Sequence, residues 1–184
     1  MREANDFKGR TFEKWGYAMS SERYTWKGEH VTLRSIKEKD APAIVKWRND
    51  PAVYCFFKVP QKITLEKHLE WYRTSYLRDE NRIDFIVELE EAKQAGTAGI
   101  IWRQEKRQAE ISYLIGQEHR RQGVAAQALK TLCQHAPLLW PVKSFAAIIH
   151  QDNIPSQKFI LAQGFVLYNK EGTFLNFTKE VSAL

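Results

Sequence analysis

Residues 109 to 135 decide the fold, and they read Ala-Glu-Ile-Ser-Tyr-Leu-Ile-Gly, Gln-Glu-His-Arg-Arg-Gln-Gly-Val-Ala-Ala and Gln-Ala-Leu-Lys-Thr-Leu-Cys-Gln-His. An apolar run with β-branched and aromatic residues ends at Gly116, a basic polar turn follows, and an Ala- and Leu-rich stretch begins at Val124. This order predicts a strand, a loop and a helix. Gly123 lies where the loop becomes the helix, and without a Cβ it lets a ligand approach the backbone. Because the first N–H groups of a helix are unpaired, the stretch predicts a phosphate site.

The loop residues 120 to 125, Arg-Arg-Gln-Gly-Val-Ala, carry a narrower pattern. They resemble the Arg/Gln-x-x-Gly-x-Gly/Ala signature of the GNAT superfamily of acyl-CoA-dependent N-acetyltransferases, in which this loop holds the pyrophosphate of coenzyme A. The loop is not a Walker loop, because no Gly-Lys-Ser/Thr ends it, and it lacks the first glycine of a dinucleotide fingerprint. Taken alone, it matches an ordinary strand-to-helix turn with one glycine equally well.

A second stretch strengthens the resemblance. Residues 144 to 150 predict a buried strand, and the helix after it is expected to begin near Asn153 and to end at Gly164. The same superfamily commonly shows an Asn after this strand, a Ser or Ala three residues on, and Gly-Phe eleven and twelve residues on. Asn153, Ser156, Gly164 and Phe165 have these spacings. Asn153 alone could be a plain N-cap and Gly164 a plain C-cap, but the two motifs in this order and separation favour membership.

The composition predicts one globular domain with an anionic partner. The chain has 184 residues, 43% of them hydrophobic, a formal net charge of +6 and a sequence pI near 9.3. The resemblance covers roughly residues 29 to 179, so we expect an acetyltransferase domain over 29–184 and an N-terminal extension of unknown role over 1–28. Coenzyme A, a sugar nucleotide and RNA are candidate anionic partners, and nucleic acid ranks lowest because the charges are dispersed.

Targeting and metal signals are missing from the sequence. Cys55 and Cys133 have no Cys-x-x-Cys or His spacing, so neither a disulfide nor a metal site is expected. No signal peptide or long apolar span is seen, so a cytoplasmic protein without a membrane partner is expected.

The predicted elements suggest an α/β (α+β) protein. Two helices are expected, one capped by Asp40 and ended at residues 49 to 51, and one starting after Thr64. Strands are expected at 29–35, at 82–90 and 96–102 as a hairpin, from Glu110, at 144–150, and at 165–168 and 173–179 as a closing hairpin. The resemblance implies the GNAT fold, a mixed, mostly antiparallel twisted sheet flanked by helices, with strands splayed at its centre.

Other segments are similar to one branch of the superfamily. Leu33-Arg34, residues 47 to 51 (Trp-Arg-Asn-Asp-Pro) and residues 110 to 113 resemble the RimJ/RimL-like enzymes, which acetylate protein N-termini and other amines. Residues 47 to 53 and 64 to 72 are further similar to acetyltransferases of nucleotide-linked 4-amino sugars in pseudaminic-type biosynthesis. The expected acceptor is therefore a nucleotide-linked amino sugar or a similar small molecule, and the alternative is a protein N-terminus of the ribosomal-protein alanine type. The substrate-binding residues expected from this resemblance are Trp47, Arg48, Asn49, Phe57 and Tyr113, with simple packing as the alternative for Trp47.

The superfamily resemblance also implies where acetyl-CoA lies. The coenzyme is expected in a V between the strands that end near Ile115 and His150, with backbone contacts from Leu114 and Ile115. Its pyrophosphate is expected on backbone N–H groups of the loop and helix start, with charge from Arg120 or Arg121. Asn153 is a further expected coenzyme contact, and the predicted N–H donors are Gln122, Gly123, Val124, Ala125 and Ala126. A homodimer is a candidate assembly.

Catalysis needs a neutral amine and a departing thiolate. An α-amino group titrates at about 7.7 to 8.0, so a modest base suffices; Glu110 is the first candidate and His150 the second. A solvated charge and a structural histidine are the respective alternatives. Many superfamily members place a proton-donating Tyr seven residues after the Asn, where this chain has Ile160. Ser156 is the alternative donor, and otherwise the thiolate leaves unassisted.

Two other classes of function fit the sequence. A non-catalytic acyl-CoA-binding module would keep the pyrophosphate loop and lose the acceptor site. An RNA-associated protein would use the basic surface, with strongly salt-dependent binding.

Overall fold

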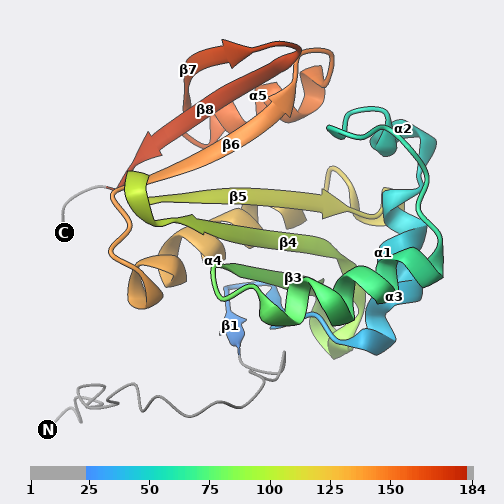
Figure 1. Ribbon diagram of the computed structural model, residues 1–184. Coiled ribbons are helices and arrows are strands. Elements are labelled where there is room, and N and C mark those ends of the chain that lie inside the picture. The colour runs from blue at the N-terminus through green and yellow to red at the C-terminus, as the bar shows by residue number, and fades with distance from the viewer. Residues whose placement is uncertain (1–23, 182–184) are drawn as a thin grey trace, which may run out of the picture.

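A computed structural model describes residues 24–181, which form one eight-stranded sheet with helices on its two faces (Figure 1). The strands are β1 (Thr25–Lys27), β2 (Thr32–Ser35), β3 (Arg82–Glu88), β4 (Gln94–Arg103), β5 (Gln108–Ile115), β6 (Ser144–His150), β7 (Val166–Glu171) and β8 (Phe174–Glu180). The helices are α1 (Ala41–Arg48), α2 (Pro51–Tyr54), α3 (Leu65–Thr74), α4 (Val124–Leu139) and α5 (Ile154–Ala162). Short 3-10 turns are η1 (Glu38–Asp40), η2 (Tyr76–Arg78), η3 (Glu90–Ala92), η4 (Gln104–Lys106) and η5 (Gln117–His119).

The sheet is mixed and mostly antiparallel, as predicted. Its order is β1-β2-β3-β4-β5-β6-β8-β7, and only β5 and β6 run parallel. The predicted hairpin of β3 and β4, the antiparallel addition of β5 and the closing hairpin of β7 and β8 are all confirmed. The two helix starts predicted after β5 and β6 are also confirmed, because α4 begins at Val124 and Asn153 caps α5.

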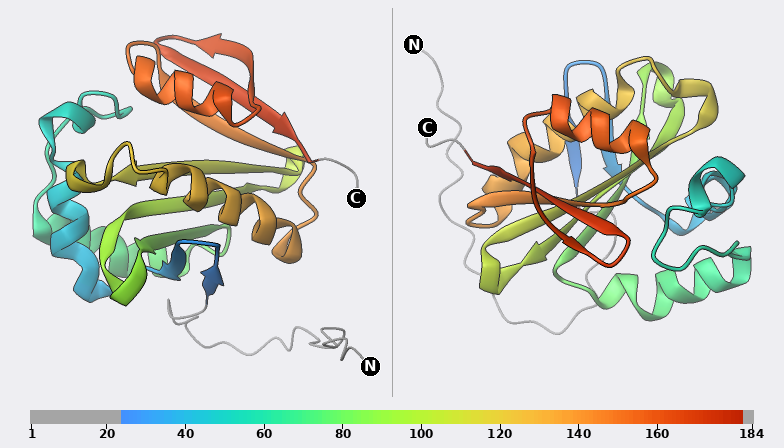
Figure 2. Two further views of the ribbon diagram at one scale, coloured as in Figure 1. Left: turned by 180° about the vertical axis from the view of Figure 1, so that it is seen from behind. Right: turned by 90° about the horizontal axis from the view of Figure 1, so that it is seen from above.

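Helices cover both faces of the sheet (Figure 2), and the buried apolar residues form two clusters, one on each face. Helix α4 packs on the face that carries Leu33, Phe85 and Ile111, and Leu129 and Leu132 are buried there. Helices α1 and α3 pack on the opposite face, around Ile86. Because β3 is covered on both faces, its apolar residues do not alternate strictly with polar ones.

The sheet splits between β5 and β6. Only residues 108 to 110 of β5 pair with residues 144 to 146 of β6. Beyond these pairs β5 stays on β4, while β6 stays on β8 along its whole length. Figure 1 shows the two strands separating toward the side on which α2 and the loop after β5 lie. The predicted V between Ile115 and His150 is therefore present.

The N-terminal extension expected over 1–28 lies mainly outside the described residues. Its last part belongs to the folded domain, because Thr25–Lys27 forms β1 and pairs antiparallel with β2. Trp26 is 6% exposed, with its ring 4.6 Å from that of Phe85 and stacked 5.2 Å from His135. The first strand predicted at 29–35 begins at Thr32 as β2.

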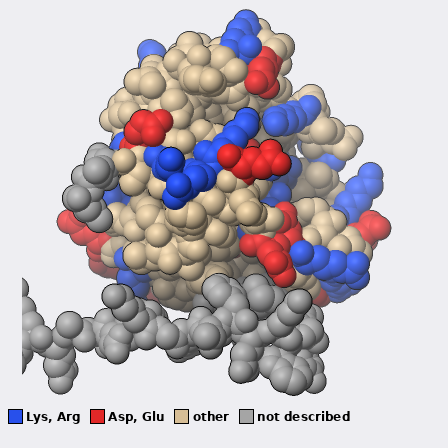
Figure 3. Space-filling view, turned by 60° about the vertical axis from the view of Figure 1, so that its left-hand side comes forward, with Lys and Arg blue, Asp and Glu red and all other residues tan. Residues whose placement is uncertain are grey.

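Basic and acidic side chains are mixed on the surface. On the face in Figure 3, Lys and Arg side chains lie beside Asp and Glu side chains, with uncharged surface between the groups. That face has no continuous basic stripe of the kind that tracks a nucleic-acid backbone. Within residues 24–181, no helix combines the length and the apolar character needed to cross a bilayer.

Asp40 joins the sheet to α1. The prediction that its side chain caps α1 is wrong: Asp40 is 2% exposed and accepts a hydrogen bond from the Lys37 N–H at 2.7 Å, in the preceding turn. Arg34 on β2 donates to both carboxylate oxygens at 2.9 and 3.1 Å, and Gln94 on β4 donates at 3.0 Å. Burial raises the pKa of Asp40, but the hydrogen bonds from Arg34 and Lys37 outweigh it, so the pKa lies below its ordinary value.

Asp40→Ala should lower the free energy of unfolding by about 3 kcal/mol, because it leaves polar partners buried without their acceptor. Since the folded pKa is lowered, the wild-type protein has this contribution above the unfolded pKa of about 3.9 and loses it as the pH falls through the folded value. Denaturant unfolding at neutral and acidic pH measures both effects. Glu38→Ala is the control, because Glu38 is an exposed partner of Arg73 and its loss should leave the midpoint unchanged. Equal midpoints for Asp40→Ala and wild type would refute this account.

Candidate active site

The split exposes backbone groups along one edge of β5. In an antiparallel ladder, hydrogen-bonded and non-hydrogen-bonded pairs alternate. The Gly116 N–H donates to the Ala95 carbonyl at 2.9 Å, so the backbone groups of Leu114, two residues earlier, point toward β4. Those of Tyr113 and Ile115 point into the opening. The backbone geometry thus speaks against the predicted pairing of Leu114 with the coenzyme, and the free backbone groups on this edge belong to Tyr113 and Ile115.

The N-terminus of α4 lies at the mouth of the opening without a side-chain cap. Gly123 precedes the helix with φ 77°, and the Gln127 N–H closes the first turn by donating to the Gly123 carbonyl at 3.1 Å. The N–H groups of Val124, Ala125 and Ala126 therefore have no intrahelical acceptor. A Cβ added at Gly123 would meet nothing within 4 Å, so this end of the helix faces open space. The helix dipole adds positive potential there.

The two adjacent arginines of the loop differ in what they contact. Arg120 donates from Nε to the Ile115 carbonyl at 2.9 Å and from its terminal nitrogen to Asp50 at 2.6 Å, so its guanidinium holds the loop on β5 and α2. Arg121 is exposed, has φ 62°, and has no ion-pair or hydrogen-bond partner among residues 24–181. Gln122 donates to the Glu118 carbonyl at 2.9 Å within the loop. Of the two arginines, Arg121 is the one whose charge is available to a ligand.

The four neighbouring side chains of the Trp-Arg-Asn-Asp segment, residues 47 to 50, contact different parts of the protein. Trp47 is 7% exposed and packs under the loop, since a Cβ at Gly116 would lie 2.8 Å from its Nε1. Asn49 exchanges two hydrogen bonds of 2.8 Å with the Ile63 backbone, which fixes the segment between α2 and α3. Trp47 and Asn49 therefore pack and hydrogen-bond within the fold, and neither of them, although predicted to contact substrate, lines a cavity. Arg48 alone of these four lines a cavity.

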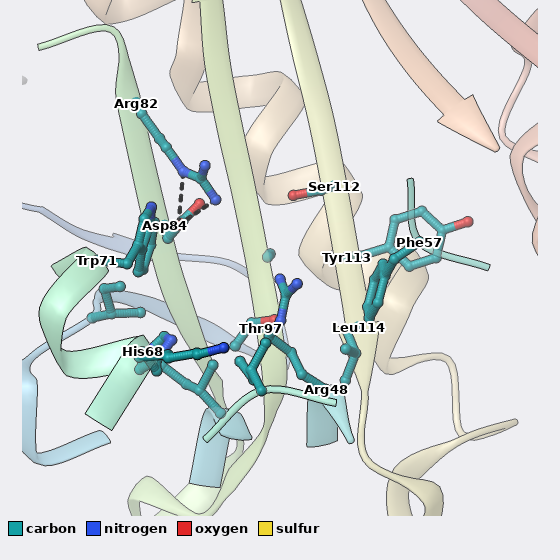
Figure 4. Close-up of a pocket in the computed structure, with 15 residues that line it drawn as sticks. Arg48, Phe57, His68, Trp71, Arg82, Asp84, Thr97, Ser112, Tyr113 and Leu114 are labelled. Atoms are coloured by element: carbon teal, nitrogen blue, oxygen red, sulfur yellow. Dashed lines mark hydrogen bonds and ion pairs between the residues drawn. The ribbon is translucent and has the colours of Figure 1, made fainter. Parts of the chain in front are cut away.

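That cavity has a volume of about 340 Å³ and lies between the sheet, α1 and α3 (Figure 4). Phe57 and Tyr113, both predicted to contact substrate, line it together with Arg48. In Figure 4, Arg82, Asp84 and Trp71 stand on one side of the cavity and Tyr113 and Phe57 on the other. Its charged lining residues are Arg48, Lys67, Arg82 and Asp84. His68 also lines it, and burial and the neighbouring Arg48 lower the pKa of that imidazole.

Asp84 is the only carboxylate that lines the cavity among the described residues, and sequence reasoning missed it. Arg82 donates to its Oδ2 from two nitrogens, each at 2.9 Å, while no hydrogen bond from a described residue reaches Oδ1. Oδ1 lies above Gly99, where an added Cβ would come within 2.5 Å of it and within 2.8 Å of Ser112 Oγ. Burial raises the pKa of Asp84, and Arg82 opposes this. In the sequence, Asp84 is merely the polar position of an alternating strand.

The two bases expected from the sequence lie elsewhere. Glu110 is at the closed end of the V, and its carboxylate accepts hydrogen bonds of 3.1 and 2.8 Å from Arg103. His150 ends β6, where its Nδ1 accepts from the Asp152 N–H at 3.2 Å and its ring packs edge-on against Phe174 at 5.3 Å. Neither side chain lines the cavity.

A pair of hydroxyl groups bridges the open V. Tyr113 Oη on β5 lies 2.7 Å from Ser156 Oγ on α5, and the Tyr113 ring packs edge-on against Phe159. Burial raises the pKa of Tyr113 to about 12, so this hydroxyl is neutral at pH 7. The Oδ1 atom of Asn153 is engaged as the cap of α5, accepting from the Ser156 N–H at 3.2 Å. Ile160 is fully buried in the apolar core and supplies no hydroxyl.

Relatives of the chain are enzymes that transfer acetyl groups. The N-acetyltransferase YoaA of Bacillus subtilis (strain 168), itself uncharacterised, is 25% identical over 153 residues, which are 81% of this chain and 85% of YoaA. The family profile described as "Acetyltransferase (GNAT) domain" matches residues 30–166, and the chain belongs to this family. The family uses acetyl-CoA as co-substrate, so the protein is an acetyl-CoA-dependent acyltransferase.

Other similarities agree with the branch expected from the sequence. The ribosomal-protein-serine acetyltransferase of Escherichia coli (strain K12) is 34% identical over 70 residues, 37% of this chain and 39% of that enzyme. A Vibrio cholerae spermidine N-acetyltransferase in complex with CoA and spermine has a TM-score of 0.73 at 18% identity, covering 82% of this chain and 95% of that one. Apo FdhC, "a nucleotide-linked sugar GNAT", has a TM-score of 0.72 at 15% identity, covering 85% and 90%. At these identities the two structures show a shared fold.

Proposed function

We propose that the protein transfers the acetyl group of acetyl-CoA to a primary amine of a small molecule, with the amine of a nucleotide-linked amino sugar as the first candidate. The observation that carries the proposal is the uncapped N-terminus of α4 at the mouth of the split sheet, with a separate cavity on the other side of β5. The sequence similarity of residues 47 to 53 and 64 to 72 to sugar-nucleotide enzymes supports the acceptor. The protein would thus bind its two substrates from opposite sides of the β5 edge.

A protein N-terminus is the second candidate acceptor. The partial match to a ribosomal-protein-serine acetyltransferase favours it. That match covers only 37% of the chain. The cavity volume of about 340 Å³ lies at the lower end of the range for small-molecule sites, which is about 300 to 1,000 Å³. We therefore rank the small molecule first.

Acetyl-CoA would lie along the open edge of β5. The N–H groups of Gln122, Gly123 and the first turn of α4 would donate to the pyrophosphate, as expected for anions at helix N-termini. Arg121 would add a charge-assisted contact. The free backbone groups of Tyr113 and the Ile115 N–H would pair with the amides of the pantetheine arm. Arg120 keeps the loop in place by occupying the Ile115 carbonyl.

Gly123→Val is expected to weaken acetyl-CoA binding at least about 100-fold, because the side chain would occupy the space in front of the N–H groups. The fold should survive, since the Cβ meets no protein atom and the left-handed backbone costs about 1 to 2 kcal/mol. Gly172→Val is a matched control: Gly172 also has a positive φ, of 59°, and open space around it, but lies in the β7–β8 turn. Isothermal titration calorimetry with acetyl-CoA measures both. Equal affinities for the two variants would refute the coenzyme site.

Asp84 would take the proton from the acceptor amine. Its Oδ1 lacks a partner among the described residues and faces the cavity floor above Gly99, while Arg82 fixes the other oxygen. A base works best when its pKa lies near the working pH, and burial raises the pKa of Asp84 from its ordinary range toward neutrality. Glu110 and His150, the bases expected from the sequence, are held by Arg103 and Asp152 outside the cavity.

Asp84→Asn should lower kcat/KM at pH 7 by about 100-fold, and the loss should shrink at high pH, where the acceptor amine is already neutral. Glu110→Gln should stay close to wild type at every pH. Acetyl transfer followed by thiol release between neutral and alkaline pH tests this, with acetyl-CoA affinity as a check that each variant is folded. If Glu110→Gln shows the larger and pH-dependent loss, Asp84 is not the base.

The hydroxyl pair of Tyr113 and Ser156 would stabilise the departing thiolate. As the amine attacks the thioester carbonyl, the carbon–sulfur bond breaks and negative charge develops on the coenzyme sulfur. A neutral hydroxyl is a hydrogen-bond donor to such a charge, and the raised pKa of Tyr113 keeps that group protonated. The pair bridges β5 and α5 at the opening. It would supply the hydrogen-bond donor that Ile160 cannot provide.

Tyr113→Phe and Ser156→Ala are each expected to reduce kcat about 10- to 100-fold without changing the Kd of acetyl-CoA. The double variant should be little worse than either single one, because the two hydroxyls act as one unit. Single-turnover kinetics at saturating acetyl-CoA separates this step from binding. Additive losses, or a loss confined to Kd, would contradict a shared role in the chemical step.

A further inference from the structure

Arg48 is a cation in the cavity wall that forms no ion pair with any of residues 24–181. Its Nε is buried and makes no hydrogen bond with any described residue, and its guanidinium lies over the Phe57 ring at 4.6 Å. Five other described arginines form ion pairs with carboxylates. These are Arg34 with Asp40, Arg73 with Glu38, Arg82 with Asp84, Arg103 with Glu110 and Arg120 with Asp50.

The environment of Arg48 disfavours its charge. Burial lowers the pKa of Arg48, and the positive charge of Arg82 lowers it further, against a weaker opposing effect of Asp84. Asp84 does not neutralise Arg48, because its ion pair is with Arg82. A buried charge without a hydrogen-bonded partner destabilises a fold, so its presence in a cavity wall points to a ligand that completes it.

The charges of the side chains that line the cavity indicate the charge of that ligand. Arg48, Lys67 and Arg82 line it with one carboxylate, Asp84, so two positive charges are unmatched. Burial and Arg48 lower the pKa of His68, which favours its uncharged form, so this side chain does not offset the cations. A polyamine would bring further positive charge to these cations. An anionic group would match them.

We propose that Arg48, with Lys67, binds a carboxylate or phosphate of the acceptor, while the amine of the same molecule lies at Asp84. This inference rests on the proposed function and names the class of its acceptor: a primary amine that carries an anionic group. Both groups must fit one cavity of about 340 Å³, so the anion is close to the amine in the molecule. Arg48 then sets specificity, since a guanidinium presents paired donors to planar or tetrahedral oxyanions.

Matched probes test the anion site without requiring turnover. Thermal unfolding is measured with CoA at saturation, so that the loop at Gly123 is occupied, and with equal concentrations of ethanolamine, O-phosphoethanolamine, β-alanine or spermidine. We expect the phosphate or the carboxylate compound to raise Tm by about 3 °C more than ethanolamine and spermidine do. Comparison of the two anionic compounds identifies the preferred oxyanion.

Arg48→Met removes the charge and keeps the length of the side chain. This variant should lose the extra stabilisation by the anionic probe, and its Tm without any probe should equal or exceed that of wild type, because no unpaired charge remains. Arg78→Met is the control: Arg78 is an exposed arginine outside the cavity, and its variant should keep the full difference between probes. A purely structural Arg48 would instead give a lower Tm in Arg48→Met and an unchanged difference between probes.

The inference is overturned if the anionic probes stabilise wild type no more than ethanolamine does, or if Arg48→Met keeps their extra effect. Calorimetry with acetyl-CoA on wild type, Arg48→Met and Arg78→Met distinguishes failure of the anion site from failure of the proposed function. Normal acetyl-CoA affinity would leave the proposed function standing without its anionic acceptor. Absence of acetyl-CoA binding in wild type would remove the proposed function itself.

Discussion

The early end of pairing between β5 and β6 is the constraint on which the site depends. After three paired residues each strand remains bonded on its outer side only, to β4 and to β8, and the two inner edges face each other unpaired. Buried backbone donors and acceptors need partners. The protein supplies one itself, since Arg120 donates to the Ile115 carbonyl, while the hydrogen bond between the Tyr113 and Ser156 hydroxyls links the two sides of the gap without using backbone groups. The remaining groups suit an extended ligand with its own amides, which is the form of a pantetheine arm.

One short segment, residues 47 to 50, contacts the loop after β5 and also lines the cavity. Residues 47 to 50 run from the last turn of α1 to the N-cap of α2, and the chain changes direction between the two helices, so neighbouring side chains reach different elements. Trp47 supports the loop at Gly116, Asp50 fixes Arg120 of the same loop, and Arg48 between them points into the cavity. The position of the cavity cation is thereby tied to the position of the loop. Acceptor and coenzyme would be held in register by this segment, which is how orientation lowers a reaction barrier.

Sequence reasoning succeeded where the deciding signal is local. The strand, loop and helix around Gly123, the cap at Asn153 and the two hairpins follow from periodicity, turn residues and caps within a few positions. Errors arose where a partner is distant in the chain. Asp40 looks like a cap until Arg34 and Gln94 from other strands approach it. Asp84 becomes a site residue only because the strand register sets it beside Gly99 and Ser112, and register depends on pairing across the whole sheet.

The loop that would bind the coenzyme is set by local sequence, whereas the cavity proposed for the acceptor is formed by residues far apart in the chain. Proteins that share the fold at 15% and 18% identity are named for acceptors as different as a nucleotide-linked sugar and spermidine. The coenzyme is common to the family, so the loop between β5 and α4 would bind the same group in each member. The cavity proposed for the acceptor is lined by residues of α1, α3 and strands β3 to β5, and the charges of these side chains can differ between proteins while the loop keeps its sequence. Because Arg48, Lys67 and Arg82 outnumber Asp84 in this chain, its cavity would disfavour a polycation as the acceptor.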